Sequence, residues 1–148
     1  MASTIRVGRT VKGSKGIYTI TRKLHDHVWV ASHLTSLSTK HTRSCAAHDN
    51  VVLKCASQKR LQREKRVLQM FKGHACIRQL IDYAGDPHCL VLEHLYEDAL
   101  RSASKAPISR LNVKTIARNV LSALESLHAN GIVHTDIKPD NMLLNYYH

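Results

Sequence analysis

The first two thirds of the chain carry short apolar stretches that predict β-strands. Residues 17–24 (IYTITRKL) alternate apolar and polar side chains and contain β-branched residues, which is typical of a half-buried strand. Further strands are predicted at residues 28–31, 51–56, 77–83 and 89–95. The sequence Gly85-Asp86-Pro87 predicts a turn between the last two. Residues 32–50, rich in Ser, Thr and His without periodicity, are expected to form a loop.

A helical period predicts a first helix over residues 58–72. Leu61, Leu68 and Phe71 lie on one stripe of this helix, and Glu64 is in phase with them. A carboxylate on the buried side of a helix is costly unless a cation meets it. Lys54, which interrupts an otherwise apolar strand, is the nearest candidate, so we expect an ion pair between Lys54 and Glu64.

The strongest helical signal covers residues 111–130, where apolar side chains recur every three or four positions. Ser109 or Asn112 is suited to be its N-cap, and Gly131 is placed to end it. The helix would be about 30 Å long. Because its apolar face is broad, we expect neighbouring segments to cover it on more than one side. Residues 142–144 predict a short strand after it.

Composition indicates one globular domain. The chain has 148 residues, of which 43% are hydrophobic, with 6 Gly and 3 Pro. No apolar run approaches the ~20 residues of a membrane helix, so we expect a soluble protein without a membrane partner. The first 25 residues share the basic composition of a transit peptide, but they lack an amphipathic stripe and run into a strand, which disfavours targeting.

The four cysteines, Cys45, Cys55, Cys76 and Cys89, do not have the spacing of a zinc site. They predict free, partly buried thiols in a reducing intracellular compartment, cytoplasmic or nuclear.

The charge of the chain raises nucleic acid as an alternative partner. The formal net charge is +11, and the densest basic cluster is Lys59, Arg60, Arg63, Lys65 and Arg66. No aromatic residues interleave with these cations to stack on bases. A solvated helix face is therefore the favoured interpretation, and a basic nucleic-acid-binding protein remains the alternative.

Residues 131–141 (GIVHTDIKPDN) carry the clearest chemical motif. His134, Asp136, Lys138 and Asn141 resemble the catalytic loop of the protein kinases, H-x-D-x-K-x-x-N. The resemblance implies that Asp136 accepts the hydroxyl proton, that Lys138 contacts the γ-phosphate of ATP, and that Asn141 binds Mg²⁺. His134 would pack the loop. Thr135 stands where Arg is usual, a variant similar to the SR-protein kinases and to fungal kinase-like sequences.

Two further stretches resemble parts of the same family. Residues 51–54 (VVLK) are similar to its V-A-I-K strand, which implies that Lys54 holds the α- and β-phosphates and that Glu64 pairs with it. Residues 92–95 (LEHL) resemble the hinge between lobes, where the backbone of Glu93 and Leu95 would meet adenine. The side chains that the resemblance places around the base are those of Val28, Val52 and Leu143.

The family pattern fails in three places, of which one is the remainder of the larger lobe, without which the long helix would keep an apolar face uncovered. Only His25, Asp26 and His27 separate the first two predicted strands, so the glycine-rich loop that covers the phosphates is missing. No Asp-Phe-Gly occurs, and seven residues follow Asn141, so the principal Mg²⁺ ligand of the family is not in the sequence. We therefore expect weakened ATP binding and impaired or absent activity in this chain alone.

The expected fold is α/β (α+β) and protein-kinase-like. Residues 1–16 would form a basic lead-in, and residues 17–95 an N-lobe with a five-stranded antiparallel sheet and one helix. Residues 96–148 would form the hinge and the first helices of a C-lobe. The expected function is ATP- and Mg²⁺-dependent phosphoryl transfer to Ser or Thr of a protein substrate. The alternative to the enzyme is a pseudokinase-like scaffold that binds a partner on its long helix. The enzyme interpretation requires Lys54 and Asp136 to face one cleft.

Overall fold

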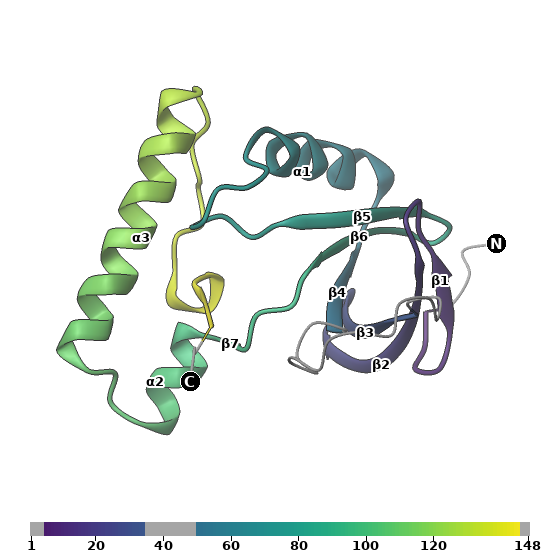
Figure 1. Ribbon diagram of the computed structural model, residues 1–148, viewed down its shortest axis with the longest axis horizontal. Coiled ribbons are helices and arrows are strands. Elements are labelled where there is room, and N and C mark those ends of the chain that lie inside the picture. Colours follow the sequence, from purple (N-terminus) through teal and green to yellow (C-terminus); the bar gives the residue numbers. More distant parts are fainter. Residues whose placement is uncertain (1–4, 35–49, 146–148) are drawn as a thin grey trace, which may run out of the picture. The chain divides into compact units, whose positions relative to one another are not determined.

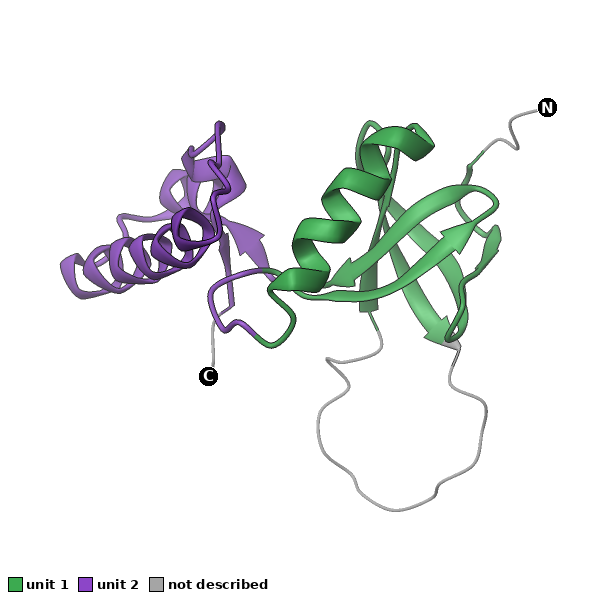
Figure 2. Cartoon of the chain, turned by 90° about the horizontal axis from the view of Figure 1, so that it is seen from above, with its two compact units in different colours: residues 1–73, 78–94 green, residues 74–77, 95–148 purple. Residues whose placement is uncertain are grey.

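The computed structural model describes residues 5–34 and 50–145, which divide into two compact units (Figure 2). Unit 1 consists of residues 1–73 and 78–94, and unit 2 of residues 74–77 and 95–148. Among the described residues, no helix is long and apolar enough to cross a membrane.

Unit 1 is built on an antiparallel sheet with the strand order β1-β2-β3-β4-β6-β5 (Figure 1). Its strands are β1 (Thr10–Lys12), β2 (Ile17–His25), β3 (Val28–Leu34), β4 (Asn50–Cys55), β5 (Leu80–Gly85) and β6 (His88–Glu93). The antiparallel sheet is confirmed, and the last two strands differ by at most three residues at either end from the predicted ranges. The predicted loop begins too early, because β3 continues through Leu34; residues 35–49 lie outside the described part of the chain.

The sheet has six strands instead of the five expected, because β1 pairs with β2. A stretch of three residues is too short to show an alternating pattern, so this strand was not predicted. Val11 at the centre of β1 is 1% exposed. A bridge between Gly13 and Ala84 also connects the turn after β1 to β5, at the other end of the strand order.

Both faces of the central strands β4 and β6 are buried. Side chains alternate along a strand, so Leu53 and Val91 belong to one apolar cluster while Val52 and Leu90 belong to the other. The second cluster includes Leu61 of helix α1 (Gln58–Met70), which is fully buried. This two-sided burial explains why β4 and β6 read as continuous apolar runs.

Unit 2 contains one long helix and several short elements. They are β7 (Glu97–Asp98), α2 (Ala99–Lys105), α3 (Arg110–Ala129), the 3₁₀ turn η1 (Pro139–Asn141) and β8 (Leu143–Leu144). The long helix is confirmed within one residue, with Ser109 as its N-cap and Gly131 at a φ of 70° after its end. Helix α2 was not predicted, because its Ser- and Ala-rich sequence has no apolar stripe.

Helix α3 has an apolar face that is partly uncovered, as expected for the long helix. Leu111, Val113 and Leu121 are 73%, 50% and 66% exposed, and Leu127 is the buried residue of the helix. His74 Nε2 and Ser126 Oγ lie 2.9 Å apart and connect residues 74–77 to the helix. The described residues therefore leave most of the apolar face open.

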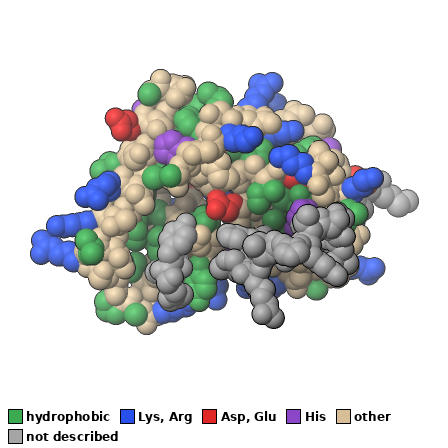
Figure 3. All heavy atoms as spheres, in the orientation of Figure 1, with side chains coloured by type: hydrophobic (Ala, Val, Ile, Leu, Met, Phe, Trp, Pro, Cys, Tyr) green, Lys and Arg blue, Asp and Glu red, His purple; other side chains and the backbone are tan. Residues whose placement is uncertain are grey.

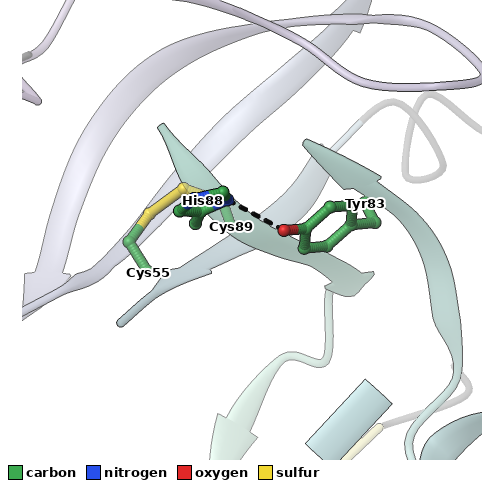
Figure 4. Close-up of a disulfide and its surroundings, with 4 residues drawn as sticks. All are labelled: Cys55, Tyr83, His88 and Cys89. Atoms are coloured by element: carbon green, nitrogen blue, oxygen red, sulfur yellow. Dashed lines mark hydrogen bonds between the residues drawn. A yellow bond between two sulfur atoms is a disulfide. The ribbon is translucent and has the colours of Figure 1, made fainter. Parts of the chain in front are cut away.

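The expectation of free thiols is wrong for two cysteines. Cys55 and Cys89 form a disulfide between β4 and β6, with their Cα atoms 4.2 Å apart (Figure 4). They lie directly opposite each other in the strand register, which a sequence separation of 34 does not reveal. Cys76 is free, and Cys45 lies outside the described residues.

The basic cluster of α1 fits the interpretation as a solvated face. Lys59, Arg60, Arg63 and Arg66 are exposed and make no ion pair with any residue that the structure describes. The fifth residue, Lys65, lies over the ring of Tyr83. Lys and Arg side chains are scattered over the face in Figure 3 without a single dominant patch.

Candidate active site

Lys54 and Glu64 form the expected ion pair. Lys54 lies on β4 and Glu64 on α1, and Lys54 Nζ is 2.7 Å from Glu64 Oε1. The strand points Lys54 to the same side as Val52, which is the side that α1 covers. The two side chains are 35% and 28% exposed, so the pair is partly open to solvent and to a charged ligand.

A tight turn joins β2 to β3 at the position of the missing glycine-rich loop. His25 pairs with Val28, and His27 between them takes a φ of 64°. The carbonyl of His27 accepts a 2.8 Å hydrogen bond from the Cys55 N–H, which fixes the turn to the end of β4. Lys23 bonds the Asp26 carboxylate at 2.7 Å and lowers the pKa of Asp26. This turn presents a carboxylate and imidazoles where glycine amides would otherwise meet phosphate oxygens.

Glu93, the expected hinge residue, makes hydrogen bonds within the protein through both its backbone N–H and its backbone carbonyl. Its N–H donates to the Gln79 carbonyl at 3.0 Å. Its carbonyl accepts a 2.7 Å hydrogen bond from Arg78 Nε. Burial lowers the pKa of Arg78 to about 10, against the opposing charges of Glu93 and Glu64. The sequence analysis missed Arg78, because a single basic residue just before a strand carries no motif.

The residues expected around the base fall in both units. Val52 is 2% exposed within the apolar cluster of unit 1, and Val28 packs against the same cluster. Leu95 and Leu143 belong to unit 2, where Leu143 lies on β8 and is 36% exposed.

The catalytic-loop residues of unit 2 lie within hydrogen-bonding distance of one another. Asn141 Nδ2 donates to the carboxylate of Asp136 at 2.8 Å and to its backbone carbonyl at 2.9 Å. Lys138 Nζ lies 3.6 Å from the carboxylate of Asp136 and 3.3 Å from that of Asp140. The turn η1 folds the loop back, which places Asn141 beside Asp136 although five positions separate them.

The neighbouring carboxylates stabilise the protonated form of Lys138. A hydrogen bond from Lys138 to Asp140, together with the charges of Asp136 and Asp140, raises the pKa of Lys138. The backbone N–H of Asp136 donates to His134 Nδ1 at 3.4 Å, so His134 orients the loop from within. Lys138 therefore remains a cation that can meet a phosphate oxygen.

The oxygen donors of the loop fit a single Mg²⁺. Asn141 directs its amide nitrogen toward Asp136, which leaves Asn141 Oδ1 available as an oxygen ligand. Magnesium is usually held by one or two protein oxygens, with substrate phosphates and water completing the shell. Among residues 5–34 and 50–145, no group of three or more His, Cys, Asp or Glu side chains could hold a metal ion without such a substrate.

The residues expected at the site thus fall into two groups, one in each unit. Lys54, Glu64, Val28, Val52 and Glu93 belong to unit 1, and Asp136, Lys138 and Asn141 lie close together in unit 2. The convergence of Lys54 and Asp136 on one cleft stays a prediction.

Comparisons with known proteins agree on one family. The family description "Protein kinase domain" matches residues 33–148. A Caenorhabditis elegans protein bearing the name of a ribosomal protein S6 kinase alpha-2 is 39% identical over 98 residues, which is 62% of this chain and 13% of that protein. The chain therefore spans a small part of that relative's length.

A solved structure supports the fold. The crystal structure of Rad53 1–466 in complex with AMP-PNP superimposes with a TM-score of 0.62 at 20% identity, covering 87% of this chain and 35% of that one.

Proposed function

Because the chain belongs to the protein kinase domain family, we propose that it acts in the phosphorylation of Ser or Thr of protein substrates with ATP. The observation that supports this most is the cluster of Asp136, Lys138 and Asn141, held by hydrogen bonds and ion pairs within one loop. Lysine two residues after the aspartate is the Ser/Thr pattern of the family.

Each residue has a defined task in this proposal. Asp136, oriented by Asn141, accepts the proton of the substrate hydroxyl, and Lys138 meets the γ-phosphate. Lys54, oriented by Glu64, holds the α- and β-phosphates. ATP with Mg²⁺ would supply the phosphoryl group and the metal charge, and the side-chain oxygen of Asn141 would hold the metal.

We further propose that ATP binding is weakened in this chain. The β2–β3 turn has no glycine, and its Asp26 carboxylate repels phosphate. The 148 residues contain no Asp-Phe-Gly, so one Mg²⁺ ligand of the family motif is not supplied by them. Phosphoryl transfer by the 148-residue chain should therefore be slow.

A thermal-shift titration with Mg·ATP tests the nucleotide site. We expect a rise in the unfolding midpoint of the wild-type chain at millimolar nucleotide, and its loss in Lys54→Met. Lys59→Met is the matched control, because Lys59 is exposed on α1 and makes no ion pair with any described residue. Equal shifts in the wild type and Lys54→Met would contradict the assignment of Lys54.

A pseudokinase-like binding module is the second candidate, and the exposed apolar side chains of α3 favour it. The two candidates differ in one measurement. Slow transfer to a protein substrate that disappears in Asp136→Asn supports the enzyme. Nucleotide binding with no transfer, unchanged by Asp136→Asn, supports the module.

A further inference from the structure

The outer side of helix α1 carries a row of cations. Lys59, Arg63 and Arg66 are spaced four and three residues apart, so they lie one above another on one side of the helix, and we call them the basic stripe. The opposite side of α1 holds Leu61, which is fully buried, and Leu68, which packs against the second apolar cluster of unit 1. The basic stripe therefore faces away from the sheet that α1 covers (Figure 1).

No carboxylate of the described residues neutralises the basic stripe. Its three side chains are exposed, and none of them forms an ion pair within residues 5–34 and 50–145. The acidic residue of α1, Glu64, already pairs with Lys54. Arg60 adds a further unpaired cation next to Lys59, so α1 presents four such charges within about two turns.

These cations lower the stability of α1. Like charges three and four residues apart on a helix repel one another. Lys59 and Arg60 also lie in the first turn, where the helix dipole disfavours cations and where α1 has neither an acidic residue nor a side-chain cap. A surface that needs only to be solvated can mix both signs of charge, which attract each other. A local arrangement that opposes stability is typical of a functional surface.

Two features of α1 favour a polypeptide ligand over a nucleic acid. The helix contains no aromatic side chain that could stack on a base. Met70 continues the basic stripe four residues after Arg66, and it is 58% exposed. Arginine and methionine are both enriched where proteins bind other proteins.

An open hollow at the start of the basic stripe offers room for an acidic side chain. It is lined by Ser57, Lys59, Arg60, Arg63 and Glu64. The charge of Glu64 is taken up by Lys54, so the unpaired charges of the hollow are positive. An arginine can meet a carboxylate with two parallel hydrogen bonds.

We propose that the basic stripe is a docking surface for an acidic segment of a partner protein, whose Asp or Glu side chains pair with Lys59, Arg63 and Arg66. The surface lies wholly within unit 1. None of its three residues belongs to the proposed nucleotide site, so the docking surface and the proposed function can fail separately.

Anisotropy of a fluorescently labelled polyglutamate peptide, titrated with the full chain, tests this surface. We expect the triple variant Lys59→Gln, Arg63→Gln, Arg66→Gln to bind the peptide roughly tenfold more weakly than wild type, the value of about three exposed ion pairs. The control variant Lys12→Gln, Arg101→Gln, Arg118→Gln removes equal charge from exposed residues of β1, α2 and α3, and should lose less than about twofold. The wild-type affinity should fall as the salt concentration rises, because exposed ion pairs are screened.

Three results would overturn the docking surface. Equal losses in the two triple variants would mean that the net charge of the chain, and not the basic stripe, attracts the peptide. Tighter binding of an oligothymidylate of similar length would identify a nucleic-acid surface, and the absence of polyglutamate binding to wild type at low salt would leave no docking surface. If circular dichroism shows that the first triple variant does not fold, Arg63→Gln and Arg118→Gln are compared instead. Weaker binding by Arg63→Gln supports the proposal, and equal binding overturns it.

Discussion

In unit 1, the buried Asp82 and the half-buried pair of Lys54 and Glu64 have different physical roles. Asp82 is 5% exposed and accepts hydrogen bonds from Tyr18 Oη at 3.0 Å, from Lys15 N at 2.8 Å and from Ser14 N at 3.2 Å. A buried carboxylate with several donors holds its neighbours firmly. The pair of Lys54 and Glu64 is more exposed and makes one ion pair, so its contribution to stability is small. Asp82 thus stabilises the fold, while Lys54 is available for a ligand.

Tyr18 gives a prediction of how stability depends on pH. Burial, followed by the hydrogen bond to Asp82 and its charge, raises the pKa of Tyr18 above its ordinary value of about 10. Above that pH the unfolded chain loses this proton and the folded chain keeps it, so the free energy of unfolding falls as pH rises. Below about pH 10 the contribution is fully present.

Urea unfolding at a series of pH values from neutral to alkaline checks this. The decline above about pH 10 should be shallower in Tyr18→Phe than in wild type, by up to about 1.4 kcal/mol per pH unit. Tyr96→Phe, at a tyrosine that is 66% exposed, should keep the wild-type slope. Parallel curves for wild type and Tyr18→Phe would show that Tyr18 ionises equally in both states.

Sequence reasoning anticipated some residue contacts for an identifiable reason. Lys54 and Glu64 each break an apolar pattern, one in a strand and the other on a helix stripe, so each required a partner of opposite charge. Asp82 and Arg78 did not stand out, because a polar residue at a strand or its edge faces solvent as readily as the interior. Their partners come from a distant turn and a distant strand end, which only the folded sheet brings near.

At the scale of elements, the two longer helices begin differently. Ser109 Oγ accepts a 3.2 Å hydrogen bond from Asn112 N–H at the start of α3. Ser57 occupies the same position before α1 and makes no side-chain cap. An N-cap hydroxyl satisfies a backbone donor that has no partner inside the helix.

This difference predicts unequal effects of one substitution. Ser109→Ala should reduce the stability of its helix by about 1 kcal/mol, because a capping bond is lost. Ser57→Ala is the matched control and should change stability by less than about 0.5 kcal/mol. Thermal unfolding followed by circular dichroism at 222 nm measures both variants. Similar losses in the two variants would contradict the capping role of Ser109.

Length decided which elements the sequence predicted. Helix α3, with 20 residues, and β2, with 9, are long enough for their periods to be read. The strands β1 and β7, of three and two residues, were not predicted, because they form only where a partner strand already lies beside them. The equally short β8 was predicted within residues 142–144, because its residues are apolar. Disulfide pairing depends on strand register in the same way.

At the scale of the whole molecule, the described part of the first 16 residues is part of the sheet. These residues were expected to precede the N-lobe as a basic lead-in. Instead, β1 extends the sheet, Val11 is buried, and the following turn supplies two backbone donors to Asp82. Ile5 also packs against the apolar cluster of unit 1. The basic composition of the segment hid a single buried valine between two exposed residues.

Removing residues 1–16 should therefore lower the free energy of unfolding of unit 1. Burial of Val11 contributes about 2 kcal/mol, and loss of the donors to Asp82 adds about 1–3 kcal/mol. In the full chain, Val11→Ala should cost about 2 kcal/mol. Val7→Ala, at a valine that is 57% exposed, should cost less than about 0.5 kcal/mol. The urea midpoints of the three variants test this order of stabilities. A truncated chain as stable as wild type would mean that the sheet does not need β1. Asp82 would then be satisfied by its remaining hydrogen bonds from Tyr18 and from the Tyr83 N–H.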